Sequence, residues 1–464
     1  MRASNRISLN LIYIPQNMKV SRILISCGLL VSLFLIIEAC KSDVVTESVE
    51  KSTWTVIQDK ILTPSCATAG CHSSVNDNTY PQHNLVLAAG SAYENLIHKT
   101  SKNAVANANG LLRVKSSDYA NSLLYHKLDC RVKRNSPNYG SLMPLGGSLL
   151  SYGQVDFIKQ WIEKGAPKTG IVVDESLLID VAMCSQTFVP LDIPAASEGF
   201  QLGIEPFTVS PNTEREVFLS RATPNTADVF VNKIEMRGRP NSHHFVLYGF
   251  QNAALLPTPN TVRDLYNANG SINISTFAQM QNHIFLGGGT DVNSTFTFPE
   301  GVALKIPPST QVDLNAHYFN KQTAALTGEN YVNLYTVAPT KVVKEAQTIN
   351  FGNYNFSIPA NQRKTITTDF TFKKDVTVIT LTSHFHKMGE KFVIKILGGA
   401  RNGEVVYENS DWQHPLMLTL TNPIQLKAGE GLTSVVTYNN TNATAVNFGF
   451  TSEDEMNIIF GYYY

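Results

Sequence analysis

The stretches 229–236 (VFVNKIEM) and 376–381 (VTVITL) indicate the fold of most of this 464-residue chain. Both are short, rich in β-branched residues, and alternate in part between apolar and polar positions, as half-buried strands do. Similar runs recur at 245–248, 302–306 and 392–396. Pro, Gly and Asn punctuate the segments between them. From about residue 185 onward, the sequence therefore predicts an all-β region built as sandwiches.

The length of this β region sets the number of sandwiches that we expect. About 280 residues are too many for one small sandwich, so we divide the region into two jelly-roll sandwiches, 185–340 and 341–464. No internal repeat of fixed period is visible in the sequence. Hydrophobic residues make up 43% of the chain, which is enough to fill such cores. The formal net charge is zero, which argues against nucleic acid as the main partner.

The N-terminus has the layout of a secretory signal. A basic segment, Met18–Arg22, precedes an apolar run of about 15 residues, which is shorter than the ~20 residues that span a membrane. We predict a signal peptide over residues 1–39, with Met18 as an alternative start. Cys40 resembles the lipid-bearing cysteine of bacterial lipoproteins, so residues 40–51 would form a lipidated tether. The predicted location is the bacterial cell envelope, in the periplasm or at the outer-membrane surface, with the membrane as a partner through the anchor.

Residues 52–167 predict a small all-α domain that precedes the two sandwiches. One helix is expected over Ser52–Leu62, where apolar residues recur at helical spacing before a proline. A second helix is expected to begin with Ser151 as its N-cap and to end before a glycine and a proline. Residues 168–184 are then a linker, and the whole chain is predicted to be multidomain.

A heme-binding element lies inside this helical region. Cys66-Ala-Thr-Ala-Gly-Cys71-His72 is a Cys-x4-Cys-His variant of the Cys-x-x-Cys-His motif, and it predicts one heme c bound through both thiols, with His72 as an axial iron ligand. Met143 is the predicted second axial ligand, and the order of these elements resembles a small class I cytochrome c. The rival second ligands are His83, His98 and His126. The alternative is a Cys66–Cys71 disulfide with an incidental histidine.

Two further cysteines, Cys130 and Cys184, remain after the heme element and the signal peptide are set aside. An exported protein can form disulfides, and this pair is the available combination. The two cysteines lie in different predicted segments, so the sequence leaves their pairing open.

Five histidines of the β region could bind a metal. His384 and His386 would point to the same face of a strand, because side chains alternate with a period of two, and such a pair chelates copper or zinc. The adjacent residues His243 and His244 would point apart on a regular strand, so they need a bulge to share one metal. The remaining histidine is His317. By local geometry alone, Met388 is the favoured third ligand beside His384 and His386.

Four segments in a fixed order resemble the copper type II ascorbate-dependent monooxygenases, a family that includes peptidylglycine α-hydroxylating monooxygenase and dopamine β-monooxygenase. They are KIEMRGRPNSHH at 233–244, FPEGVA at 298–303 with NAHY at 315–318, SHFHKMG at 383–389, and TSEDEMNIIFGYY at 451–463. The resemblance covers most of the chain after about residue 185. It implies two linked β-sandwiches with one copper ion on each.

The resemblance also implies the ligand sets. His243, His244 and His317 would hold an electron-transfer copper, while His384, His386 and Met456 would hold the copper that meets O2. Met388 falls at a position that is not a ligand in the family, so it is expected to pack nearby. The other histidines of the region, His283 and His414, are expected to lie at the surface or to support the ligands.

The implied reaction is hydroxylation of a C–H bond with O2, which requires two electrons for each turnover. The expected partners are a small-molecule or peptide substrate, O2, and an electron donor that is either ascorbate or a redox protein. The fused heme suggests a built-in donor. A non-catalytic copper-binding or electron-transfer lipoprotein is the alternative. A zinc hydrolase is a third class, but Glu390 is the nearest acid to the later histidine pair and no HExxH element is present.

Overall fold

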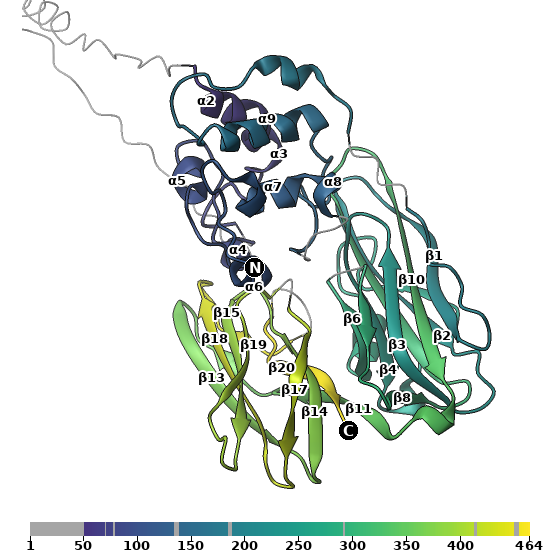
Figure 1. Ribbon diagram of the computed structural model, residues 1–464. Coiled ribbons are helices and arrows are strands. Elements are labelled where there is room, and N and C mark those ends of the chain that lie inside the picture. The colour runs from purple at the N-terminus through teal and green to yellow at the C-terminus, as the bar shows by residue number, and fades with distance from the viewer. Residues whose placement is uncertain are drawn as a thin grey trace, which may run out of the picture. The chain divides into compact units, whose positions relative to one another are not determined.

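The structure, a computed structural model, describes residues 51–69, 71–77, 79–133, 139–183, 188–290, 293–412, 415–449 and 454–464 (Figure 1). The predicted signal peptide 1–39, the predicted lipidation site Cys40, Cys184 and His414 all lie outside these residues. None of the described helices is long and apolar enough to cross a membrane.

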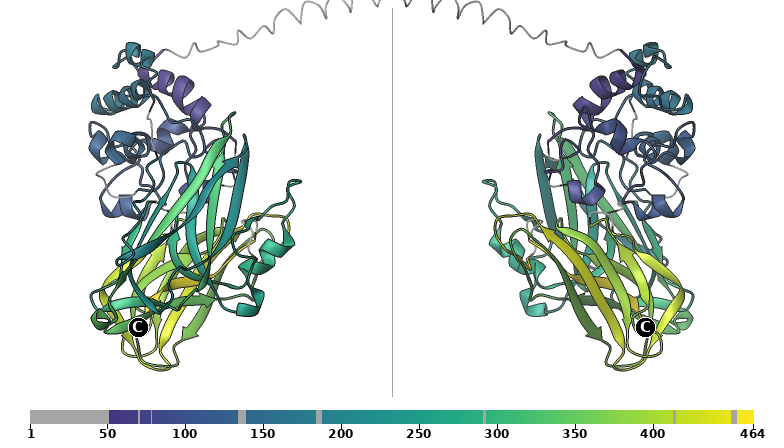
Figure 2. Two further views of the ribbon diagram at one scale, coloured as in Figure 1. Left: turned by 90° about the vertical axis from the view of Figure 1, so that its right-hand side faces the viewer. Right: turned by 90° about the vertical axis from the view of Figure 1, so that its left-hand side faces the viewer.

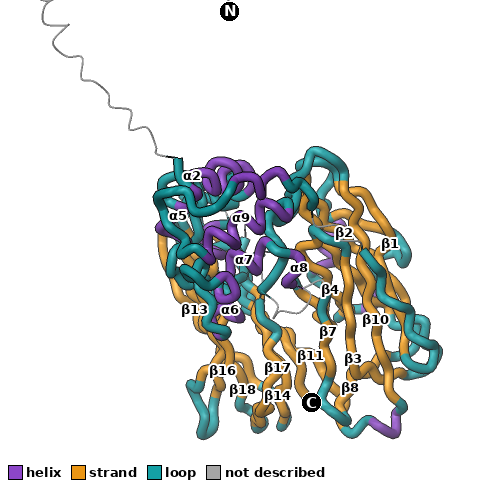
Figure 3. The backbone as a smooth tube through the Cα atoms, turned by 45° about the horizontal axis from the view of Figure 1, so that its top comes forward, coloured by secondary structure: helices purple, strands orange, loops and turns teal. Residues whose placement is uncertain are grey.

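Short helices occupy the N-terminal part of the described chain (Figure 3). They are α2 (Thr53–Ile57), η2 (Gln58–Leu62), α3 (Thr63–Ser65), α4 (Tyr80–His83), α5 (Ala92–Leu96), α6 (Ala104–Ala108), η3 (Tyr119–Asn121), α7 (Leu123–Leu128), α8 (Cys130–Lys133), α9 (Tyr152–Glu163) and η4 (Glu175–Ile179). The first three run on from one another as a single helical stretch with a π-helical segment at η2. The helix expected over Ser52–Leu62 is therefore confirmed, and it continues through Pro64 into α3.

Capping side chains fix where both predicted helices begin. The side chains of Ser52 and Ser151 each accept a hydrogen bond from the backbone N–H three residues on. The side chain of that third residue accepts in turn from the backbone N–H of the serine. The two helices pack through Trp54 and Trp161, whose ring centroids are 5.3 Å apart within one buried apolar cluster. The identity of this helical part as a cytochrome stays a prediction.

Strands make up most of the chain after residue 198. In the first half they are β1 (Gly199–Val209), β2 (Thr213–Ala222), β3 (Val229–Gly238), β4 (Ser242–Phe250), β5 (Val262–Asp264), β6 (His283–Gly289), β7 (Thr295–Thr297), β8 (Val302–Ile306), β9 (Gln311–Asn320) and β10 (Leu326–Val337), with η5 (Ala253–Leu255), α10 (Ile274–Met280) and η6 (Pro339–Lys341) between or after them. In the second half they are β11 (Lys344–Gly352), β12 (Ser357–Ile358), β13 (Gln362–Thr371), β14 (Val376–His384), β15 (Gly389–Leu397), β16 (Val405–Asn409), β17 (Leu418–Leu426), β18 (Gly431–Asn440), β19 (Val446–Asn447) and β20 (Ile458–Tyr463). All five runs that predicted strands are strands.

The described strands form sandwich-like pairs of sheets (Figure 2). The sheets are β1-β10-β3-β8-β11-β20-β14-β17 with β7 beside β3, β5-β2-β9-β4-β6, β13-β18-β15-β16, and β12-β19. The first of these is shared by both halves of the β region, because β8 and β11 pair in parallel with Val302 opposite Lys344. The sequence did not indicate this pairing, since it joins strands from the two predicted sandwiches.

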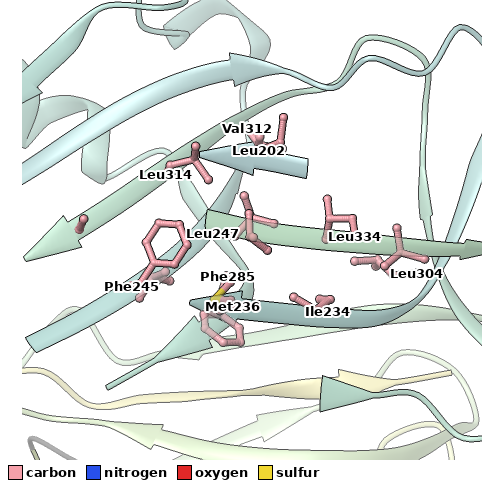
Figure 4. Packing of buried hydrophobic residues seen from close by; sticks show 14 of the residues in the cluster. Leu202, Ile234, Met236, Phe245, Leu247, Phe285, Leu304, Val312, Leu314 and Leu334 are labelled. Carbon is pink, nitrogen blue, oxygen red and sulfur yellow. The ribbon is translucent and has the colours of Figure 1, made fainter. Parts of the chain in front are cut away.

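Each half of the β region has its own apolar core. In the first half, side chains from two sheets meet, including Leu247 and Leu314 from one sheet and Ile234 and Leu334 from the other (Figure 4). In the second half, an equivalent cluster joins β14 and β20 to the β13-β18-β15-β16 sheet. Burial alternates along part of β3, as the sequence pattern indicates, whereas β9 and β14 are buried at almost every position.

The strands β9 and β18 end in the same way, although no repeat is visible in the sequence. Asn320 ends β9, and Asn440 ends β18. Each donates from its side-chain nitrogen to three backbone carbonyls, which are those of Val209, Ser210 and Ala324 in the first case and those of Ile358, Pro359 and Thr444 in the second. Each side-chain oxygen also accepts from the N–H two residues on. The two sandwiches therefore share a local framework.

Candidate metal centres

The first candidate centre is formed by three histidines on two neighbouring strands. His243 and His244 lie on β4, and His317 lies on β9. Each offers one ligand nitrogen, and these nitrogens all lie within 4.8 Å of one another. The ring centroids are 5.1 to 5.5 Å apart, with interplanar angles of 57° to 83°. The rings therefore surround a common point instead of stacking.

A β-bulge allows the two adjacent histidines to share this centre. In the pairing of β4 with β9, Ser242 lies opposite Tyr318 and His244 lies opposite His317. His243 is therefore an extra residue on its strand, which breaks the alternation that would turn the two imidazoles to opposite faces. The bulge predicted from the sequence is confirmed.

Polar side chains on neighbouring strands orient His244. Its Nε2 lies 2.8 Å from Oδ1 of Asn315 and 3.6 Å from Oε1 of Glu216. Asn315 donates from Nδ2 to the same glutamate oxygen at 3.0 Å. Burial alone would raise the pKa of Glu216, but the hydrogen bond from His244 and the neighbouring His317 lower it to about 2. Because Nε2 is engaged, Nδ1 is the candidate ligand atom of His244.

His317 is buried in a form suited to metal binding. Burial lowers the pKa of its imidazole to about 4, with Glu216 opposing the shift, and a neutral imidazole offers a lone pair to a metal. Within the described chain its Nε2 is buried without a hydrogen-bond partner, and Oε1 of Glu214 lies 3.9 Å away. The ring of Phe319 covers the centre, with its centroid 4.6 Å from that of His317 and 5.1 Å from that of His243.

The second candidate centre begins where β14 ends. His384 is the last residue of that strand, and the chain turns through Lys387 and Met388 before β15. The argument that placed His384 and His386 on one strand face is therefore wrong in its premise, because the strand does not reach His386. The two imidazoles still lie together, with ring centroids 5.0 Å apart and planes at 89°. The two histidines are therefore neighbours in space, although only His384 belongs to the strand.

The segment that precedes β20 holds this histidine pair in place. Nδ1 of His386 lies 3.0 Å from the carbonyl oxygen of Asp454, which makes Nε2 its candidate ligand atom. Burial, with a further contribution from His386, lowers the pKa of His384 to about 3. Burial also raises the pKa of Glu455 to about 8, against the effect of the backbone N–H groups that its carboxyl accepts. His384 is thus presented as a neutral imidazole.

Met456 is buried on the same segment. β14 and β20 are antiparallel, and their last pair is His384 with Ile458. Continuing this register by two residues would set Met456 opposite His386, and directly opposed residues face the same side of a sheet. The fold therefore brings the segment that carries Met456 to the histidine pair.

Met388, the rival ligand, lies in the turn between β14 and β15. Its side chain is as buried as that of Met456, each at 5% exposure. Its backbone N–H donates to Glu455, and its carbonyl accepts from the N–H of Asn439. The choice between the two methionines stays a prediction that rests on the family resemblance.

Sequence reasoning missed the side chains that surround the two centres. They are Glu216, Asn315 and Phe319 at the first centre, and Trp412 and Glu455 at the second. Trp412 lies with its ring centroid 6.2 Å from that of His386. Glu455 directly precedes Met456, so its position next to a predicted ligand could have marked it as part of the second centre. Asn315 and Phe319 lie two residues from His317 on β9, so strand periodicity was a signal for them, whereas Glu216 and Trp412 come from other segments and gave none.

In the helical region, the structure describes the predicted heme element. Cys66 and Cys71 are both free thiols, so the disulfide alternative for this pair is wrong. Burial, then the neighbouring Cys71, raises the pKa of the Cys66 thiol to about 12. Nδ1 of His72 lies 3.1 Å from the carbonyl oxygen of Leu85, and its ring lies 4.1 Å from that of His83, centroid to centroid.

The other residues predicted around the heme have different surroundings. Met143 is partly buried and packs against the helical core that includes Cys66. His98 is exposed, and Nε2 of His126 bonds the carbonyl of a nearby residue at 2.7 Å. Cys130 is disulfide-bonded. Because Cys184 lies outside the described residues, its pairing with Cys130 stays open.

The expectation that His283 is a surface residue is wrong. Its side chain is only 7% exposed, and its Nε2 lies 2.8 Å from Oδ2 of the fully buried Asp313. Its ring stacks on Tyr248 at 4.4 Å with an interplanar angle of 5°. Arg263 also donates to both oxygens of Asp313. A buried acid on β9 and an arginine on β5, two other strands of the same sheet, account for this position.

Comparison with known protein families finds a match in the C-terminal part of the chain. Residues 342–464 match the family described as copper type II ascorbate-dependent monooxygenase, C-terminal domain. This segment contains His384, His386 and Met456. The match supports a copper-dependent monooxygenase, and the family implies a substrate, O2 and an ascorbate-type reductant. No curated protein matches the chain.

Similar solved structures include two viral capsid proteins and a glycosylasparaginase. The STIV MCP is 9% identical, with a TM-score of 0.27, and the match covers 57% of this chain and 96% of that one. The major capsid protein P2 of bacteriophage PM2 is 8% identical, with a TM-score of 0.20 and coverage of 54% and 97%. PNGase F of Flavobacterium meningosepticum is 8% identical, with a TM-score of 0.20 and coverage of 59% and 94%. At such scores these likenesses carry no argument.

Proposed function

We propose that the protein is a copper-dependent monooxygenase that hydroxylates a C–H bond with O2. An electron-transfer copper would be held by His243, His244 and His317, and the copper that meets O2 by His384, His386 and Met456. The observation that carries the proposal is the family match over 342–464, which contains the second ligand set. The three converging histidines of the other sandwich support it, because their nitrogens lie close enough together to hold a metal ion in a part of the chain that the match does not reach.

The donor sets fit copper. Imidazole nitrogens suit copper and zinc alike, but a thioether is a soft ligand that favours Cu(I) over zinc. Copper bound at these sites would supply single-electron transfer at the first and activation of O2 at the second. In His244 and His386 the chain fixes one ring nitrogen through Asn315 or through the carbonyl of Asp454, which sets the direction in which the other nitrogen faces.

The helical region would supply electrons through a covalent heme c. Both thiols needed for thioether bonds, those of Cys66 and Cys71, are free, and the hydrogen bond from Nδ1 of His72 to a carbonyl makes Nε2 the iron-binding atom, with Met143 as the proposed second ligand. The signal peptide and the lipid on Cys40 belong to the same proposal, since heme c and disulfides are features of exported proteins.

A contact between the helical region and the first centre supports this electron route. Gly146, three residues after Met143, lies so close to Phe319 that a Cβ there would come within 3.0 Å of the Phe319 carbonyl oxygen. The N–H of Lys321 donates to the carbonyl of Gly146 at 2.8 Å. Because the ring of Phe319 packs on His317, the loop that follows the proposed heme ligand contacts the first centre through one side chain.

The reaction is tested by following oxygen in the copper-loaded protein. With ascorbate and a panel of peptide and small-molecule substrates, we expect consumption of O2 and transfer of one labelled oxygen atom from ¹⁸O2 into a hydroxylated product. His384→Ala should abolish the incorporation. Ascorbate oxidation without oxygen incorporation in any substrate would favour the alternative, a copper-binding or electron-transfer lipoprotein.

The heme proposal has its own test. Stopped-flow mixing of the ferrous protein with oxidised copper centres should show heme oxidation at the same rate as copper reduction. A matched variant, Cys66→Ser with Cys71→Ser, should lack covalent heme and still bind copper. If heme oxidation and copper reduction are uncoupled in the unchanged protein, the electron route is wrong, whereas the copper sites are unaffected.

A further inference from the structure

The carboxyl group of Glu455 is buried without measurable exposure beside the second candidate centre. Three backbone N–H groups donate to it: that of Met388 to Oε1 at 2.6 Å, and those of His386 and Met456 to Oε2 at 2.9 and 3.3 Å. A buried carboxyl that satisfies three main-chain donors joins segments that secondary structure does not join.

Two of these three donors lie on the segments that carry the proposed ligands. The β14–β20 ladder ends with the pair His384 and Ile458, so neither His386 nor Met456 belongs to it. A single atom, Oε2 of Glu455, instead bonds the backbone N–H of His386 and that of Met456. The side chain of Glu455 thus replaces strand pairing at the point where the two ligand-bearing segments face each other.

The backbone of Glu455 is itself held in place. Its N–H donates to the carbonyl of Asn447 at 3.1 Å, and its carbonyl accepts from the N–H of Gly449 at the same distance. The other oxygen of its carboxyl group binds the turn at Met388. The turn and the segment before β20 are therefore tied to one fixed side chain.

We propose that Glu455 is a positioning residue, whose carboxyl oxygens set the separation between the imidazole of His386 and the thioether of Met456. This inference rests on the proposed function, in which both side chains bind one copper ion. Both oxygens act as acceptors, so an amide in this place would turn an N–H2 group toward at least one backbone N–H. Glu455→Gln keeps the size of the side chain and removes one acceptor.

The matched control is Asn440, a fully buried side chain of the same sandwich that also holds three main-chain groups. Its partners, Ile358, Pro359 and Thr444, lie outside the two ligand-bearing segments. Asn440→Asp disturbs a buried polar clamp of similar size without touching the contacts of Glu455. A general loss of order in the sandwich would therefore affect both variants.

The first measurement is amide hydrogen exchange in the metal-free protein. We expect the amides of His386, Met388 and Met456 to exchange at least about tenfold faster in Glu455→Gln, with no such change in Asn440→Asp, because a hydrogen bond to each is lost or weakened. Equal exchange at these amides in Glu455→Gln and the unchanged protein would overturn the inference, as would the same acceleration in the control.

The second measurement is X-ray absorption of the Cu(I)-loaded protein. The sulfur contribution to copper scattering should fall in Glu455→Gln to the level of Met456→Ala, while Asn440→Asp keeps it. Unchanged sulfur scattering in Glu455→Gln would contradict the positioning role. If the unchanged protein itself shows no sulfur ligand, the proposed site has failed, and exchange in the metal-free protein still decides whether Glu455 orders the two segments.

A variant that keeps the carboxyl group covers the case in which Glu455→Gln does not fold. Glu455→Asp retains two acceptor oxygens on a side chain that is one methylene shorter. We expect it to fold and to retain sulfur scattering at a level between the unchanged protein and Met456→Ala. Sulfur scattering equal to that of the unchanged protein in a folded Glu455→Asp would show that the position of the carboxyl oxygens is not what sets the separation.

Discussion

The two candidate centres occupy similar frameworks but are built in different ways. His244 and His317 face each other across a regular strand pair, and a bulge adds His243 to them. His386 and Met456 lie beyond the ends of their strands and are tied together by Glu455. Strand pairing therefore holds the first centre in place, whereas the second depends on the side chain of Glu455 and on two segments that lie outside the strands.

The shared framework sharpens this contrast. Asn320 and Asn440 end β9 and β18 with the same set of hydrogen bonds, and a tyrosine stands two residues before each. The residue before that tyrosine is His317 in the first sandwich and a threonine in the second. In the second sandwich the tyrosine donates instead to the carbonyl of Met456 at 2.6 Å. The same strand end supplies a ligand directly in one half and supports a ligand-bearing segment in the other.

The largest expected effect comes from removing one centre at a time. His384→Ala with His386→Ala should abolish oxygen incorporation and remove one of the two coppers, while His243→Ala with His244→Ala should remove the other. Copper analysis after gel filtration, with oxygen uptake, checks both. If either double variant lost both coppers and remained folded, the two centres would not be independent.

The two methionines are separated by the next prediction. Met456→Ala should eliminate sulfur scattering from Cu(I), whereas Met388→Ala should retain it. Met388→Ala should still lower the free energy of unfolding by about 2–5 kcal/mol, because a buried side chain is truncated. X-ray absorption and denaturant unfolding measure the two effects. Loss of sulfur scattering in Met388→Ala alone would move the ligand to the turn.

A smaller effect is expected from the side chain that orients His244. Asn315→Ala removes the partner of Nε2 and should weaken copper binding at the first centre by about 10- to 100-fold. The second centre should be unchanged, because its histidines are fixed by a different segment. Competition with a chelator of known affinity gives both constants. Equal weakening at both centres would point to a general loss of stability.

The smallest expected difference concerns the shared framework. Asn320→Ala and Asn440→Ala each remove one side-chain donor from three backbone carbonyls. One carbonyl in each set is buried, that of Val209 or that of Ile358, and leaving a buried group unsatisfied costs about 1–3 kcal/mol. The two costs should be similar, and denaturant unfolding measures them. A large difference between them would show that the two strand ends are alike in contacts but not in energy.

The sequence predicted the parts of this molecule that depend on local periodicity. Alternation placed the strands correctly, and the need for two adjacent histidines to share one metal predicted the bulge at His243. Periodicity failed at His386, because β14 ends at His384 and the chain then turns through Lys387 and Met388 to enter β15. The motif alone left open either a heme c bound through both thiols or a disulfide between Cys66 and Cys71, and the free thiols exclude the disulfide.

The rest depended on contacts between residues far apart in the chain. Asn315 and Glu216 meet His244 through strand pairing, whose register no local pattern fixes. The buried position of His283 depends on Asp313, which lies on a different strand. The sheet shared by both halves arises from the parallel pairing of β8 with β11. Each of these features requires the tertiary fold and could not have been read from a short segment.

The account rests on two separate copper centres, one in each half of the β region. The most direct measurement is metal analysis of the protein after loading with copper and removal of the excess, together with the electron paramagnetic resonance signal of the oxidised form. We predict two coppers for each chain, and one copper in each of the two double histidine variants. A protein that retains one copper or none, or that prefers zinc under competition, would contradict the account.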